Sequence, residues 1–113
     1  MSTILTAMIL PKGTLDYFDP IHVEQVEGGV IIHLEEKNIL PEGYSADDYE
    51  CKDFLPSKGV QDFPIRGQGV LLEIVRRRWR HKTTGKTITR DWKVVMDGGL
   101  VTQEFADFLK GID

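Results

Sequence analysis

The sequence predicts an α+β domain in which a small antiparallel β-sheet is flanked by short N- and C-terminal helices. Apolar residues at helical spacing occupy the first 19 residues, β-branched runs separated by glycine turns fill the middle, and a second helical stripe lies near the C-terminus. The 113 residues, 41% hydrophobic and 28% charged, fit one soluble globular domain spanning residues 1–113.

The two helices are predicted from apolar spacing and from residues that start or stop helices. The N-terminal stripe consists of Ile4, Leu5, Met8 and Ile9. Asp19 is followed by Pro20, which disfavours a helical conformation at the residue before it and should end this helical region. Thr102 is a suitable N-cap for the C-terminal helix, and Gly111 closes it.

The middle of the chain begins with a hairpin signal. Residues 21–26 and 30–34 are strand-like, and Gly28-Gly29 between them favours a tight turn with positive φ. Residues 38–57 are acidic and rich in turn-forming residues, so we expect an exposed loop there. Residues 60–63, broken by Pro64, predict an edge strand.

A basic β-hairpin is predicted over residues 66–96. Residues 70–80 form its first strand, residues 82–85 its loop, and residues 86–96 the returning strand. The expected opposite pairs are Trp79–Ile88, Arg80–Thr87, Arg78–Thr89, Arg76–Asp91, Val75–Trp92 and Glu73–Val94. One face then carries tryptophans and aliphatic residues, and the other carries arginines and threonines. Arg77 and Arg90 fall on the tryptophan face, where stacking of their guanidiniums on indole rings would accommodate them.

Positive charge is concentrated in this hairpin although the whole chain has a net charge of −4. Residues 1–57 carry 3 basic and 11 acidic residues, whereas residues 66–93 carry 9 basic and 2 acidic residues. Such a segment is typical of a surface that binds a polyanion. The same charges could instead be neutralised by the acidic N-terminal half folding over them, and the sequence leaves both interpretations open.

Catalytic and metal-binding patterns are absent from the sequence. His22, His33 and His81 have no metal-ligand spacing with one another or with Cys51, and no cofactor motif occurs. We therefore expect a non-enzyme without metal or cofactor. The apolar runs are too short for a membrane span, and a lone cysteine is typical of a reducing, cytoplasmic location.

The chain resembles the N-terminal zinc-ribbon segment of ISL-type insertion-sequence transposases at Val60–Gly67, Val70, Leu72, Arg77–Arg80 and Gly85–Thr89. His81 and Thr84 stand where that pattern has cysteines, so the resemblance implies a degenerate zinc-ribbon-like hairpin without metal. Over its whole length the chain is more similar to the short proteins encoded as the separate N-terminal region of ISAon-type bacterial transposases. The matching stretches are Leu15–Phe18, Leu34–Asn38 and Thr102–Phe105.

This resemblance implies a non-catalytic accessory domain that binds duplex DNA, at transposon ends or without sequence preference, while a separate catalytic subunit cleaves the strands. The expected DNA contacts are Arg66, Arg76, Arg78, Arg80, Lys82, Lys86 and Arg90. Five to seven phosphate contacts predict a log–log salt slope of roughly −5 or −6. The alternative is a protein-interaction module that docks onto the catalytic subunit or forms a homodimer through an exposed strand edge.

Overall fold

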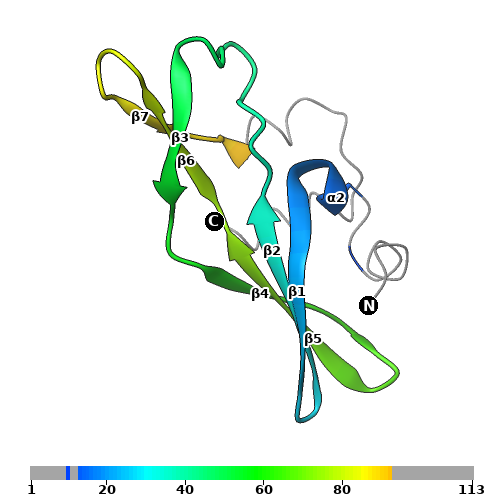
Figure 1. Ribbon diagram of the computed structural model, residues 1–113. Helices are drawn as coiled ribbons and strands as arrows, with labels where there is room; N and C mark the ends of the chain where they lie inside the picture. Colours follow the sequence, from blue (N-terminus) through cyan, green and yellow to red (C-terminus); the bar gives the residue numbers. More distant parts are fainter. Residues whose placement is uncertain (1–9, 11–12, 93–113) are drawn as a thin grey trace.

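The computed structural model describes residue 10 and residues 13–92 as two β-sheets with one short helix (Figure 1). The helix is α2 (Thr14–Tyr17). The strands are β1 (Phe18–Val26), β2 (Gly29–Glu36), β3 (Tyr49–Phe54), β4 (Lys58–Ile65), β5 (Gln68–Val75), β6 (Arg77–His81) and β7 (Thr87–Thr89). The four-stranded sheet has the order β1-β2-β5-β4, and the three-stranded sheet has the order β3-β6-β7.

The predicted α+β class with flanking helices is wrong, because the described residues are predominantly β-strand. The helix over 14–17 is about one turn long, and Phe18 already begins β1. Asp19-Pro20 therefore lies inside an edge strand, where proline is tolerated because one side of the strand needs no backbone donor. The apolar stripe over residues 4–9 and the helix over residues 102–111 lie outside the described residues.

A long two-stranded ribbon runs through both sheets. The β4–β5 hairpin continues into the β3–β6 pair, because only residues 55–57 separate β3 from β4 and only Arg76 separates β5 from β6. The Leu55 N–H donates to the Arg76 carbonyl at 2.8 Å and bridges the interruption. The two ends of this ribbon, the β4–β5 turn and the β6–β7 turn, lie at opposite ends of the molecule (Figure 1).

The predicted first hairpin is confirmed as β1 and β2, which pair antiparallel around a turn at Gly28 with φ of 83°. Next to it, β2 pairs parallel with β5, and Gly29 lies directly opposite Gly69. A Cβ built on Gly29 would lie 2.1 Å from the Gly69 carbonyl oxygen, so this pairing requires glycine. The two hairpins thus lie side by side and form one sheet.

One face of the four-stranded sheet carries the core. Alternate residues of β2 and β5 are buried, which is the period expected of strands with one covered face. The core residues are Leu10, Phe18, Ile32, Leu34, Val60, Val70, Leu72, Ile74 and Trp92. Trp92 stacks on Phe18 with ring centroids 5.2 Å apart and contacts Tyr17 edge-on at 5.5 Å.

The basic hairpin is shorter than predicted, but its turn and register are confirmed. The His81 N–H donates to the Lys86 carbonyl at 2.8 Å across the four-residue loop. The pairs Arg78–Thr89, Trp79–Ile88 and Arg80–Thr87 are present as expected.

The hairpin prediction fails beyond these pairs. Val75 pairs with Glu35, and Glu73 pairs with His33 and Gly59, because β5 is a central strand between β2 and β4. Trp92 belongs to the core of the four-stranded sheet, and the β6–β7 register of the described residues ends at Arg78–Thr89, short of the predicted Val75–Trp92 and Arg76–Asp91 positions. Residues 93–96 of the predicted returning strand lie outside the described residues.

None of the helices in the described residues has the length and apolar character needed to cross a membrane.

Candidate nucleic-acid interface

The predicted arginine–threonine face exists on the three-stranded sheet, but a third strand supplies it with carboxylates. Strand β3 pairs with β6 on the side opposite β7, which places Glu50 beside Arg80 and Asp53 beside Arg78. Residues 49–54 were predicted as part of an exposed loop, and that prediction is wrong. The face therefore alternates carboxylate, arginine and threonine across the sheet, with Glu50–Arg80–Thr87 as one row.

Arg78 is held by both oxygens of Asp53. Its Nε donates to Oδ1 at 2.7 Å and its Nη2 donates to Oδ2 at 2.6 Å. This fork is the strongest geometry available to an arginine–carboxylate pair. The hydrogen bonds from Arg78 lower the pKa of Asp53, and those to Asp53 raise the pKa of Arg78. Arg78 is thus largely neutralised within the protein.

Arg80 is bound less firmly than Arg78. A single hydrogen bond of 2.9 Å joins its Nη2 to Glu50 Oε1. The two side chains are 48% and 45% exposed, so solvent screens the pair and it contributes little to stability. Arg80 can therefore exchange Glu50 for another anion at small cost.

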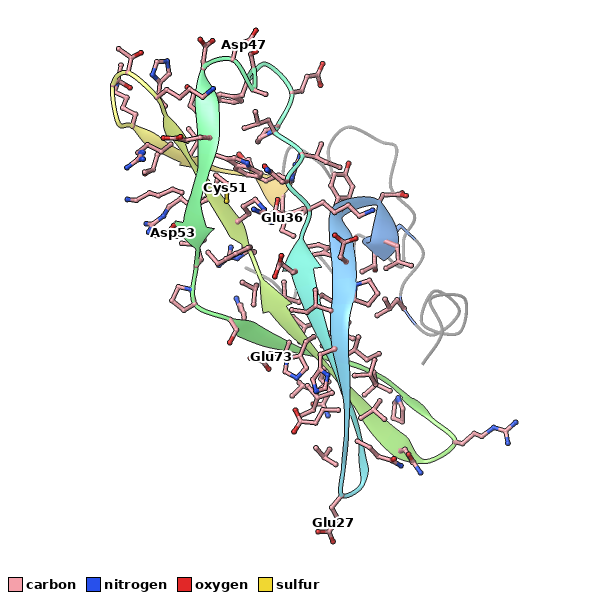
Figure 2. The ribbon with its side chains drawn as sticks, in the orientation of Figure 1. Glu27, Glu36, Asp47, Cys51, Asp53 and Glu73 are labelled. Carbon is pink, nitrogen blue, oxygen red and sulfur yellow. The ribbon has the colours of Figure 1, made fainter. Side chains whose placement is uncertain are left out.

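Arg77 and Arg90 lie on the tryptophan side, as predicted, and both contact Glu36. The backbone N–H of Arg77 donates to Glu36 Oε1 at 2.9 Å, and the side-chain Nε of Arg90 donates to Glu36 Oε2 at 3.0 Å. The Arg90 and Glu36 side chains are only 8% and 1% exposed. Figure 2 shows Glu36 at the end of β2, beside the point where β5 passes into β6. Burial raises the pKa of Glu36, and its hydrogen bonds to Arg77 and Arg90 oppose that shift.

The predicted guanidinium stacking is confirmed for Arg90. Its Cζ lies 5.2 Å from the ring centroid of Tyr17, 5.7 Å from that of Trp92 and 5.9 Å from that of Trp79. Arg77 instead lies 4.7 Å from the centroid of Phe54. Arg90 is enclosed by carboxylate and aromatic rings, so a DNA phosphate cannot reach it in this arrangement.

Two more of the predicted contacts lie outside β6 and the turn that follows it. Arg66 lies in the β4–β5 turn, at the far end of the ribbon, with φ of 50°. Arg76 lies at the junction of β5 and β6, where its Nε is buried without a hydrogen-bond partner among the described residues. The structure therefore separates these two residues and Arg90 from the other four.

The remaining four predicted contacts, Arg78, Arg80, Lys82 and Lys86, gather on β6 and the turn that follows it. Lys82 and Lys86 are both exposed at this turn. Lys82 Nζ donates to the Ala46 carbonyl at 3.0 Å, which orients the ammonium without neutralising it. His81 Nδ1 accepts the N–H groups of Thr83 and Thr84, each at 3.1 Å, and so orders the loop.

One further basic residue near this face, Lys52, was not among the contacts expected from the sequence. Lys52 is exposed in β3, at an irregularity in the pairing between Cys51 and Asp53, and its charge helps to lower the pKa of Asp53. The signal that could have found β3 is the pair of aromatic residues, Tyr49 and Phe54, which bound a six-residue run between turn-rich segments. Figure 2 shows Asp53 and Cys51 along this strand.

The histidines and the cysteine do not form a metal centre in the part of the chain that the structure describes. No group of three or more His, Cys, Asp or Glu side chains there is arranged to hold a metal ion. His22 and His33 lie across the β1–β2 hairpin with ring centroids 5.4 Å apart, and His33 Nε2 is 3.3 Å from Glu24 Oε1. Cys51 is exposed and accepts a hydrogen bond from Arg77 Nη1 at 2.8 Å.

Comparisons with known proteins add no functional assignment. No family model, no curated protein sequence and no solved structure matches the chain.

Proposed function

We propose that this chain is a non-catalytic, DNA-binding accessory domain of a bacterial insertion-sequence transposase, acting in the cytoplasm beside a separate catalytic subunit. The resemblance to the N-terminal region of ISAon-type transposases suggests this role. The observation that carries it is the group of exposed cations at the β6–β7 end of the ribbon. These are Arg80, Lys82 and Lys86.

The position of these cations suits contact with a phosphate backbone. They lie at one end of an extended ribbon, at the end opposite the β4–β5 turn (Figure 1). Thr87 and Thr89 are exposed on the same face as Arg80 and provide hydroxyl donors, which commonly bind phosphate oxygens. Contacts of this kind fix the position of DNA without selecting its sequence.

A matched pair of charge reversals tests this proposal. Lys86→Glu and Arg66→Glu change the net charge equally, and both positions are exposed turns, but they lie at opposite ends of the ribbon. We expect Lys86→Glu to weaken binding to every labelled duplex and to reduce the salt slope by about 1, whereas Arg66→Glu has little effect. Equal loss in both variants would contradict the proposed site. Absence of binding at low salt by the folded wild-type chain would contradict DNA binding altogether.

A protein-interaction module is the second candidate, and the internal ion pairs favour it. Arg77, Arg78 and Arg80 each have a carboxylate partner within the chain, so these arginines do not require an external anion. In this case the same mixed-charge face would dock onto the catalytic subunit. Co-purification of the two chains without DNA, lost in Arg80→Glu but kept in Arg66→Glu, would favour this candidate.

Self-association through a strand edge is less favoured than docking through a face. The outer strand β1 carries Pro20 and a register irregularity beside it, and the outer strand β4 carries Pro64 and a second irregularity. Proline and bulges on edge strands hinder pairing with another chain. A monomeric mass in solution, measured by light scattering, would agree with this reading, and a stable dimer would contradict it.

A further inference from the structure

We infer that Asp53 and Glu50 are internal competitors for the DNA-binding face: they occupy Arg78 and Arg80 in the free protein, and DNA must displace them. The inference rests on the proposed function and assigns a regulatory role to two carboxylates on the neighbouring strand β3.

The geometry of Arg78 shows why Asp53 competes with phosphate. A phosphate group binds arginine through two parallel N–H donors, and this is also how carboxylates bind it. In this protein Asp53 takes both Nε and Nη2 of Arg78, at 2.7 Å and 2.6 Å. A phosphate approaching that edge of the guanidinium has to replace Asp53.

Exposure decides which pairs can open. Arg78 and Asp53 are 32% and 42% exposed, and Arg80 and Glu50 are about half exposed, so water and ions reach both pairs. The Arg90–Glu36 pair is 8% and 1% exposed and lies among aromatic rings, so it stays closed. Among the arginine–carboxylate pairs of the described residues, the two on the arginine–threonine face are therefore the most open to exchange with DNA.

The consequence is a face that is nearly neutral until DNA arrives. Lys82 and Lys86 attract the duplex first, because no carboxylate contacts them in the described residues, and the arginines join only after giving up their own partners. Such a face binds DNA more weakly than its number of arginines suggests. Removing one carboxylate should release one arginine and strengthen binding.

Asp53→Asn and Asp47→Asn form a matched test. Both exchange the same residue types in the same acidic segment and change the net charge equally. Asp53 holds Arg78, whereas the Asp47 side chain lies at the exposed end of β3 without an ion pair to a described residue (Figure 2). We expect Asp53→Asn to bind labelled duplex DNA roughly three- to tenfold more tightly than Asp47→Asn. Its salt slope should also be steeper by about 1.

The outcomes separate this inference from the proposed function. An equal gain in the two variants would be a long-range charge effect and would overturn the inference alone. No binding by the wild type or by Asp53→Asn would overturn the proposed function and the inference together. Glu50→Gln against Glu42→Gln repeats the test on Arg80 with a second matched pair, and we expect a smaller gain of about two- to fivefold. Unfolding midpoints of all variants verify that each one is folded.

Discussion

Glu36 links the end of β2 to segments of the three-stranded sheet through a buried, ion-paired carboxylate. Its carboxylate accepts one hydrogen bond from the backbone N–H of Arg77, at the start of β6, and another from the side chain of Arg90, just after β7. Both oxygens are thus used to hold segments that are 41 and 54 residues away in the sequence. A buried carboxylate that is paired in this way specifies one arrangement of the strands rather than adding much net stability.

The raised pKa of Glu36 predicts a pH dependence of stability. Between its ordinary value of 4.5 and its raised value, the folded state binds more protons at this site than the unfolded state. The contribution of Glu36 to the free energy of unfolding should therefore fall as the pH rises through this window. The pKa of Asp53 is lowered, so its contribution to the free energy of unfolding should fall as the pH drops below the ordinary value of 3.8.

Urea unfolding of the wild type and of Glu36→Gln from pH 4.5 to 7 measures this effect. The free energy of unfolding of the wild type, minus that of the variant, should decrease as the pH rises. A difference that grows with pH would mean that Arg77 and Arg90 more than offset the burial of the charge.

Trp79 offers a second prediction for a single residue. Its ring is fully buried, and Nε1 donates to Asn38 Oδ1 at 2.9 Å. Asn38→Ala leaves this buried N–H without its acceptor, so we expect the free energy of unfolding to fall by about 1–3 kcal/mol. Asn38→Asp keeps an acceptor and is the control. Equal denaturation midpoints for Asn38→Ala and the wild type would show that the Trp79–Asn38 hydrogen bond does not contribute to stability.

For individual strands, local signals could be read from the sequence and distant pairings could not. Gly28-Gly29 and the loop at 82–85 fix their hairpins through a few neighbouring residues; both hairpins were predicted, and the second was predicted with its register near the turn. Strand β3 was missed because residues 49–54 are stabilised as a strand only by pairing with β6, about 30 residues away. The carboxylate partners of Arg78 and Arg80 depend on the same pairing, so they could not be predicted either.

The parallel contact between β2 and β5 gives a prediction about these strands. Gly29→Ala would place a Cβ 2.1 Å from the Gly69 carbonyl oxygen, so the strands would have to separate. We expect the free energy of unfolding to fall by at least about 2 kcal/mol. Gly59→Ala is the control, because a Cβ there meets only side-chain atoms at 3.4 Å and 3.5 Å. A loss of similar size in both variants would contradict the close approach of β2 and β5.

Across the whole molecule, the described strands form an extended ribbon with Arg80, Lys82 and Lys86 exposed at one end and Arg66 exposed at the other. The sequence predicted the excess of positive charge and the face on which Arg78 and Arg80 lie. It could not predict that Arg66 would lie at the opposite end, or that Arg90 would be buried against Glu36. Both outcomes depend on how the hairpins pair with one another, and charge spacing along the chain contains no such information.

If DNA contacts only the cations at the β6–β7 end, the salt dependence of binding reports how many of them bind phosphate. The measurement is the affinity of the wild-type chain for one labelled duplex across a series of salt concentrations. With Arg80, Lys82 and Lys86 as the phosphate contacts, log affinity should fall against log salt with a slope of roughly −3. A slope of about −5 or steeper would contradict this count of contacts, because it would require phosphate contacts from residues that lie elsewhere, such as Arg66 at the opposite end of the ribbon and the buried Arg90.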